Sequence, residues 1–149
     1  MFASKLFFMK KISLIIILFS LFIFSAEAQD KTIPAPIAPY SPAVLVNGIL
    51  YISGQIPINP ANNELVTGAI GEQTHQVMKN LGSLLKSFGF EYSDLVKCTI
   101  YMTDMANYKA INDVYGSYFN GNFPAREAVQ VVKLPKNAEI EISGIAVKR

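Results

Sequence analysis

The sequence predicts an α+β domain in which two helices pack on one face of a single β-sheet. Apolar, β-branched stretches alternate with two segments of helical periodicity, in the order β-β-α-β-α-β-β. Each helical segment has one apolar face, which must be buried against another layer. No internal repeat or low-complexity linker divides the chain, and 149 residues suit a single domain.

The first 28 residues are predicted to be a signal peptide. Lys10 and Lys11 precede an apolar run over residues 12–24, and residues 26–28 (Ala-Glu-Ala) supply the small residues of a cleavage site. The run is shorter than the roughly 20 residues of a membrane span, which disfavours the alternative of an uncleaved anchor. We therefore expect residues 29–149 to be exported to the periplasm or the medium, without stable membrane association. Met1 and Met9 are both candidate start sites.

The chain that remains after cleavage carries no net charge. Residues 1–28 hold three lysines and one acidic residue, which accounts for the whole formal net charge of +2. A neutral surface with scattered charges is a poor match for a phosphate backbone. There is also no basic patch and no glycine-lysine phosphate loop. We therefore expect no nucleic-acid partner.

A single cysteine and a single histidine limit the available chemistry. An oxidising compartment permits disulfides, but Cys98 has no partner within the chain. Cys98 lies in an apolar run and is expected to fill the core, whereas a nucleophilic role would need an electropositive, accessible setting. His75 is expected to be a solvated helix residue. One histidine and one cysteine do not make a usual zinc site, so no metal is expected.

A hairpin opens the domain after a proline-rich, extended lead-in over residues 30–42. Residues 43–46 and 49–53 are apolar, and Asn47-Gly48 between them favours a two-residue turn because both residues tolerate positive φ. Gly54 then permits the close approach of a ligand or another backbone. Residues 56–71 are rich in Pro, Gly and Asn and are expected to form a loop.

Two helices and a strand follow. The first helix is expected over residues 72–88, with Gly89 as its stop. Its apolar face comprises Val77, Leu81, Leu84, Leu85 and Phe88. Residues 95–102 are expected to form a strand with Val96, Cys98, Ile100 and Met102 on one face. Asp104 is a candidate cap for the second helix, over residues 106–119.

The second helix carries a polar residue in its apolar stripe. The stripe comprises Tyr108, Ile111, Tyr115 and Phe119 and is expected to be core. Asn112 lies on the same face. Because a buried amide must find hydrogen-bond partners, Asn112 either ties down a loop or points into a site.

The last two strands hold the candidate binding residues. Arg126 begins an apolar strand after residues 123–125 (Phe-Pro-Ala), and Glu141 lies in the final strand over residues 139–147. A guanidinium is a rigid fork that fits a carboxylate with two hydrogen bonds, and a strand end is a stiff mount. We therefore expect Arg126 to bind a small, carboxylate-bearing substrate. The alternatives are a surface ion pair of Arg126 with Glu127 or Glu139, and a solvated edge position for Glu141.

The strands predict a homo-oligomer. They are apolar on both faces, so the face without helices is expected to meet other subunits. If the last two strands pair as a hairpin around residues 135–138, Arg126 and Glu141 lie roughly 20 Å apart along the ladder, at about 3.3 Å per residue. We therefore predict that Arg126 of one chain faces Glu141 of another.

Several motifs together resemble the Rid (reactive intermediate deaminase) family, also called YjgF-like proteins. They are Tyr40, Ser53-Gly54-Gln55-Ile56-Pro57, Asn112, Phe123-Pro124-Ala125-Arg126, Leu134-Pro135-Lys136 and Ile140-Glu141-Ile142. The resemblance extends from about residue 36 to the C-terminus, and the Ser-Gly-Gln-Ile-Pro and Pro-Ala-Arg segments are its specific parts. It implies a chorismate-mutase-like α+β fold, assembled as a homotrimer with ligand sites between subunits.

The resemblance also implies an activity, the hydrolysis of 2-imino or 2-enamino acids to 2-oxo acids and ammonia without a metal or organic cofactor. It implies that Arg126 binds the substrate carboxylate and that Glu141 positions or activates water. The implied pocket-lining residues are Tyr40, Ser53, Gly54 and Asn112. The best-known active subfamily has a cysteine where this chain has Ala128, which alters the pocket wall.

Two other functions stay open from the sequence. One is a non-catalytic trimer that binds a small carboxylate metabolite or another protein. The other is a ribonuclease, an activity with which the family has also been credited. The neutral charge after cleavage and the lack of a histidine pair for acid–base chemistry argue against the ribonuclease.

Overall fold

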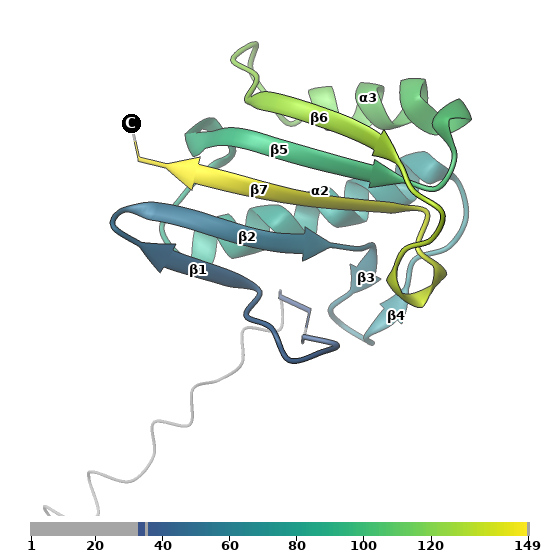
Figure 1. The fold of residues 1–149 in the computed structure, drawn as a ribbon, viewed down its shortest axis with the longest axis horizontal. Coiled ribbons are helices and arrows are strands. Elements are labelled where there is room, and N and C mark those ends of the chain that lie inside the picture. The colour runs from purple at the N-terminus through teal and green to yellow at the C-terminus, as the bar shows by residue number, and fades with distance from the viewer. Residues whose placement is uncertain (1–32, 35, 149) are drawn as a thin grey trace, which may run out of the picture. The chain divides into compact units, whose positions relative to one another are not determined.

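Two helices cover one face of a five-stranded sheet in the part of the chain that the structure describes, residues 33–34 and 36–148 of a computed structural model (Figure 1). The elements are β1 (Ala43–Val46), β2 (Ile49–Gln55), α2 (Ile70–Ser87), β5 (Leu95–Met102), α3 (Tyr108–Gly116), β6 (Ala125–Gln130) and β7 (Ile140–Val147). The predicted α+β class and main element order are confirmed. The predicted signal segment lies outside the described residues. Within those residues, no helix is both long and apolar enough to cross a membrane.

The sheet has the strand order β1-β2-β7-β5-β6. The direct pairing that was assumed for the last two strands is therefore wrong, because β5 lies between β6 and β7 and pairs with both. β6 runs parallel to β5, and a parallel pair needs a crossover connection. α3 supplies this crossover and leaves β6 at the sheet edge. Arg126 is level with Cys98 of β5, whereas Glu141 is level with Tyr101.

Most predicted turns and caps form as expected. Asn47 and Gly48 have φ values of 52° and 76°, which make the two-residue hairpin turn. The Asp104 side chain accepts a hydrogen bond from the Ala106 N–H at 2.8 Å and so caps the turn η2 (Met105–Asn107) that precedes α3. The segment expected to be a loop contains a small hairpin, β3 (Ile58–Asn59) and β4 (Glu64–Leu65).

The core lies between the sheet and the helices. Its largest fully buried members are Leu50, Val77, Met78, Leu81, Leu84, Leu85, Leu95, Ile100, Met102, Ile111, Ile140 and Ile142. Cys98 is also fully buried, which confirms its core position, and burial raises the pKa of its thiol. Val96 departs from the predicted stripe because a β-bulge between Leu95 and Lys97 shifts the alternation, so that Leu95 is buried instead.

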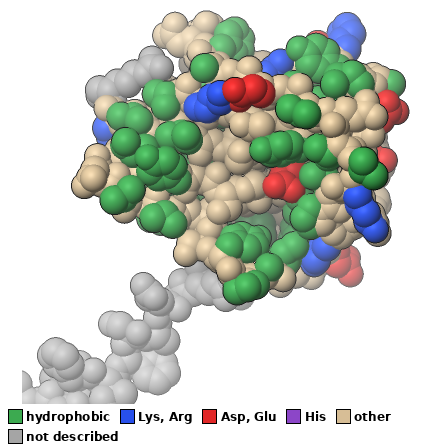
Figure 2. Space-filling view, viewed as in Figure 1, with side chains coloured by type: hydrophobic (Ala, Val, Ile, Leu, Met, Phe, Trp, Pro, Cys, Tyr) green, Lys and Arg blue, Asp and Glu red, His purple; other side chains and the backbone are tan. Residues whose placement is uncertain are grey.

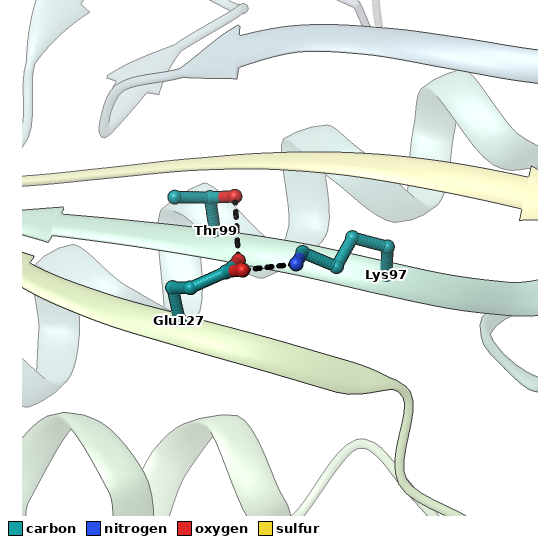
Figure 3. Close-up of polar contacts among 3 residues, drawn as sticks. All are labelled: Lys97, Thr99 and Glu127. Atoms are coloured by element: carbon teal, nitrogen blue, oxygen red, sulfur yellow. Dashed lines mark hydrogen bonds and ion pairs between the residues drawn. The ribbon is translucent and has the colours of Figure 1, made fainter.

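The opposite face of the sheet carries charged and apolar side chains together. Lys97 and Glu127 form an ion pair there, and the Thr99 hydroxyl donates to Glu127 at 3.4 Å (Figure 3). The hydrogen bond from Lys97 lowers the pKa of the Glu127 carboxyl. Apolar side chains gather on the left of this face in Figure 2. The exposed apolar residues whose side chains point to the uncovered face of the sheet are Val44, Val46, Tyr51 and Val129.

Candidate active site

The side chain of Arg126 lies on the face of β6 that meets α3. Its Nη1 donates to Oδ1 of Asn112 at 2.7 Å, and its Nη2 donates to the hydroxyl of Tyr108 at 3.3 Å. The guanidinium carbon lies 5.1 Å from the centre of the Tyr115 ring and 5.9 Å from that of Tyr108. These distances are in the range of cation–π attraction. We call these four residues, with Ala128 beside them on β6, the arginine half-site.

Helical spacing explains how α3 holds the arginine. Tyr108, Asn112 and Tyr115 stand at positions i, i+4 and i+7 and therefore share one helix face. Asn112 thus points to Arg126 rather than tying down a loop. Tyr108 was expected in the core, but its side chain is 42% exposed beside the guanidinium. Its spacing of four residues from Asn112 was the signal in the sequence that links it to the site.

Arg126 does not form the surface ion pairs that were considered as alternatives. Successive strand residues point to opposite faces, so Glu127 lies with Lys97 on the uncovered face (Figure 3). Glu139 instead accepts a hydrogen bond from Gln73 at 2.7 Å. Among residues 33–34 and 36–148, no carboxylate pairs with Arg126. Because a guanidinium has five N–H donors, donors remain for a ligand.

Glu141 lies on the other face of the sheet, at a cavity of about 310 Å³. Its neighbours Ile140 and Ile142 are fully buried under the helices, so its own side chain alternates to the uncovered face. The cavity is lined by Ile37, Ala38, Tyr40, Ser53, Gly54, Ile56, Pro135 and Glu141, which we call the glutamate half-site. Partial burial raises the pKa of the Glu141 carboxyl. Such a carboxyl suits proton transfer closer to neutral pH.

An irregularity in β2 makes room for the Glu141 carboxyl. The register between β2 and β7 shifts between Ile52 and Gln55, which places a β-bulge at Ser53-Gly54. A Cβ atom on Gly54 would overlap with Oε1 of Glu141. Gly54 was expected to permit the close approach of a ligand or another backbone, but the group that approaches it is the Glu141 side chain. The Ser53 hydroxyl donates to the Ser41 carbonyl at 2.8 Å and ties the segment next to Tyr40 to the sheet.

Asn80 supports the cavity wall and is not among the residues predicted from the sequence. It is buried in α2, and its Nδ2 donates to the carbonyls of Ile56 and Ile58 at 3.1 and 2.9 Å. These bonds hold the chain segment that contributes Ile56 to the cavity. The signal available in the sequence was a polar residue on the buried face of a helix, as for Asn112.

Gly54→Ala is expected to impair the site more than the fold. The added methyl group would displace the flexible end of the Glu141 side chain rather than backbone. For the hydrolysis that the family resemblance implies, we expect kcat to fall about 10²-fold, the lower range for acid–base catalysis, with little change in Tm. Gly71→Ala is the matched control, since its Cβ would make an ordinary 3.6 Å contact with Val114. Equal turnover by Gly54→Ala and wild type would show that Gly54 does not position the carboxyl.

The predicted site residues therefore form two groups in one chain. Tyr40, Ser53, Gly54 and Glu141 line the cavity. Asn112, Arg126 and Ala128 lie on the helix-covered face with Tyr108 and Tyr115. A larger cavity, about 670 Å³, lies between the end of α2 and the segment after α3 and is lined by none of the predicted site residues.

The chain is similar to one family of proteins along most of its length. The family model described as Endoribonuclease L-PSP matches residues 30–148. A human protein named 2-iminobutanoate/2-iminopropanoate deaminase is 44% identical over 115 residues, which cover 77% of this chain and 84% of that protein.

Solved structures give the same result. The crystal structure of YyfA from Yersinia pestis, a protein of the conserved Rid family, is 48% identical with a TM-score of 0.77, and the match covers 79% of this chain and 94% of that chain. The structure of E. coli TdcF with bound serine is 31% identical with a TM-score of 0.76, over 80% of this chain and 95% of that chain. The chain therefore belongs to the Endoribonuclease L-PSP family, the Rid and YjgF-like proteins, as its motifs predicted.

Proposed function

We propose that this protein hydrolyses 2-imino and 2-enamino acids to 2-oxo acids and ammonia. The observation that carries the proposal is the guanidinium of Arg126, held at two nitrogens by Asn112 and Tyr108 and without an ion pair among the described residues. A guanidinium held in this way has donors left for a carboxylate. The name of the human relative and the serine bound to E. coli TdcF, a small carboxylate, support the same ligand class.

The proposed site is completed between two copies of the chain, with Arg126 of one copy facing Glu141 of the next. The two side chains project from opposite faces of the sheet, so one small ligand would not contact both within a chain. A contact between two different surfaces is heterologous, and such contacts commonly close into rings. We propose a homotrimer, and the exposed apolar side chains of the uncovered face suit burial against other copies.

The reaction in this cleft requires water and one proton carrier. With the carboxylate on Arg126, the Glu141 carboxylate accepts a proton as water oxygen bonds to C2 of the imine. Glu141 passes this proton to nitrogen, which gives a carbinolamine. Glu141 then takes the hydroxyl proton and transfers it to nitrogen as the C2–O double bond forms and the C–N bond breaks, so that the 2-oxo acid and ammonia leave. An enamine first tautomerises to the imine by protonation at C3. Acid–base assistance of this kind is worth about 10²–10⁴-fold.

The remaining half-site residues shape the cleft around this chemistry. Tyr40, Ser53 and Gly54 line the cavity at Glu141, where the attacking water would be held. Ala128 lies two residues after Arg126 on the same face of β6 and packs against the core. Its small side chain would form the wall next to the bound carboxylate.

Release of 2-oxo acid from imines generated in situ tests the proposal. An amino-acid oxidase with catalase supplies 2-iminobutanoate, and semicarbazide intercepts the imine that has not been hydrolysed. We expect the wild-type protein to accelerate 2-oxobutanoate release over the spontaneous reaction. Absence of acceleration would favour the alternative, a non-catalytic module that binds small carboxylates. A parallel incubation with RNA is expected to show no cleavage.

The kcat/KM for imine hydrolysis is expected to fall in acid, with a midpoint above about 4.3, the usual pKa of glutamate. The carboxylate form of Glu141 must accept the proton, and burial raises its pKa. Profiles of kcat/KM against pH should show this acidic limb for the wild type and lack it for Glu141→Gln, whose rate should be about 10²-fold lower. A wild-type profile without the limb would contradict the role of Glu141.

Protonation of Glu141 is expected to lower activity but to favour the folded state. A raised pKa in the folded state means that neutral Glu141 favours folding below the unfolded pKa, and this contribution is lost as the pH rises through the folded pKa. Glu141→Gln is therefore expected to be at least as stable as the wild type near neutral pH. Its loss of activity would then not reflect unfolding.

We also propose that residues 1–28 direct export and are removed after Ala28. The support is the order of a basic start, an apolar run and the small residues Ala26 and Ala28. Amino-terminal sequencing of protein recovered from the periplasm or medium is expected to begin at Gln29. Recovery of the uncleaved chain from the cytoplasm alone would overturn this proposal.

A further inference from the structure

Tyr108 has an unused hydrogen-bond donor beside the proposed carboxylate site. Its hydroxyl oxygen accepts from Nη2 of Arg126 at 3.3 Å. A phenolic hydroxyl also has one proton to donate, and no acceptor for it is found in the described part of the chain. The side chain is 42% exposed, so a ligand can reach the hydroxyl.

We propose that Tyr108 is a second ligand of the substrate carboxylate. This inference rests on the proposed function of Arg126. The Tyr108 O–H would donate to one carboxylate oxygen while the Arg126 guanidinium donates to the same carboxylate. Two donors 3.3 Å apart can share one carboxylate, because its two oxygens offer about four lone-pair sites. Tyr108 would then hold Arg126 and substrate at once.

The other two residues on this face of α3 do not fit the role. The Asn112 side chain turns its carbonyl oxygen to Arg126 and accepts rather than donates there. The Tyr115 side chain is 3% exposed, and its hydroxyl is buried beside the Cys98 thiol. Tyr108 is therefore the member of the stripe whose hydroxyl is both accessible and next to the arginine.

The start of α3 is fastened to the strand that carries Arg126. The Met105 N–H in η2 donates to Oε1 of Gln130 on β6 at 3.1 Å. The Asp104 cap fixes the same turn, and Tyr108 follows it directly. Tyr108 and Arg126, the two proposed ligands of the substrate carboxylate, thus lie on elements that are hydrogen-bonded to each other. A site held in this way binds with less loss of side-chain entropy.

Binding of the unreactive product 2-oxobutanoate tests the inference. Its Kd is measured for the wild type, Tyr108→Phe and Tyr118→Phe, and compared with the Kd of methyl 2-oxobutanoate, which lacks the negative charge. Tyr118→Phe is the matched control, because its hydroxyl contacts His75 Nδ1 at 3.0 Å and not Arg126. We expect Tyr108→Phe to weaken binding of the acid about tenfold, the effect of one hydrogen bond to a charged group.

The ester distinguishes carboxylate binding from a structural effect. Loss of the hydroxyl should change binding of the ester little, and Tyr118→Phe should change neither ligand. Equal affinity of Tyr108→Phe and wild type for the acid, or an equal loss for acid and ester, would overturn the inference. Failure of the wild type to bind 2-oxobutanoate would overturn it as well. A tenfold loss confined to the acid supports it even if no imine is hydrolysed, which separates it from the proposed activity.

Discussion

Arg126→Ala is expected to lower kcat/KM for imine hydrolysis by about 10³-fold. A bidentate carboxylate contact consists of two hydrogen bonds to charged groups, each worth about 1.5–3 kcal/mol. Their combined loss of about 3–6 kcal/mol spans the roughly 4 kcal/mol that correspond to a thousandfold change. Loss of orientation at C2 should reduce kcat in addition to raising KM. Initial rates of 2-oxobutanoate release measure both constants.

The fold should tolerate this substitution. Arg126 forms no ion pair among the described residues. The Asn112 amide, which would lose its hydrogen bond from Arg126, is only partly buried. We therefore expect a change of a few degrees in Tm for a domain of this size. Arg126→Lys should lose less activity, because it keeps the charge but not the fork. Lys86→Ala removes a cation from α2 and should behave as wild type. Equal rates for Arg126→Ala and wild type would remove Arg126 from the mechanism.

Two inactive variants are expected to recover activity when they assemble together. If each site takes Arg126 from one copy and Glu141 from the next, an Arg126→Ala chain still supplies Glu141, and a Glu141→Gln chain still supplies Arg126. In a ring of three chains that contains both variants, one of the three interfaces combines the two intact residues. The isolated mixed rings should therefore reach about a third of wild-type turnover, far above either variant alone.

Co-expression with two different affinity tags isolates the mixed rings for this measurement. Co-assembly of Arg126→Ala with the Arg126→Ala, Glu141→Gln double variant is the matched control, because no interface then holds an intact arginine. Light scattering on the same samples measures the number of chains. Mixed rings without recovered turnover, or a monomeric protein with turnover, would show that the site is complete within one chain.

Local sequence patterns were sufficient for most of the secondary structure. The Asn47-Gly48 turn and the apolar face of α2 follow from the backbone freedom of two residues and from helical periodicity. Three candidate site residues came from chemistry at particular positions: a guanidinium at a strand start, an amide on an apolar stripe and a glycine after a strand. The family resemblance added Tyr40, Ser53 and the role of Glu141. These signals are local, so they do not depend on which elements become neighbours.

The arrangement of these residues required the tertiary structure. The hairpin assumed for the last two strands was wrong because β7 enters between β2 and β5, a choice made by hydrogen bonds between distant segments. The bulge at Gly54 and the contact of Tyr108 with Arg126 depend on the same arrangement.

The sequence by itself therefore determined the main element types and the family, and it predicted part of each half-site, whereas Tyr108 and Tyr115 were expected to be core. Only the tertiary structure decided that Arg126 lies under α3 while Glu141 lies on the uncovered face. The physical reason is that periodicity specifies which residues of one element share a face, whereas the neighbour that covers this face is selected by packing of the whole chain.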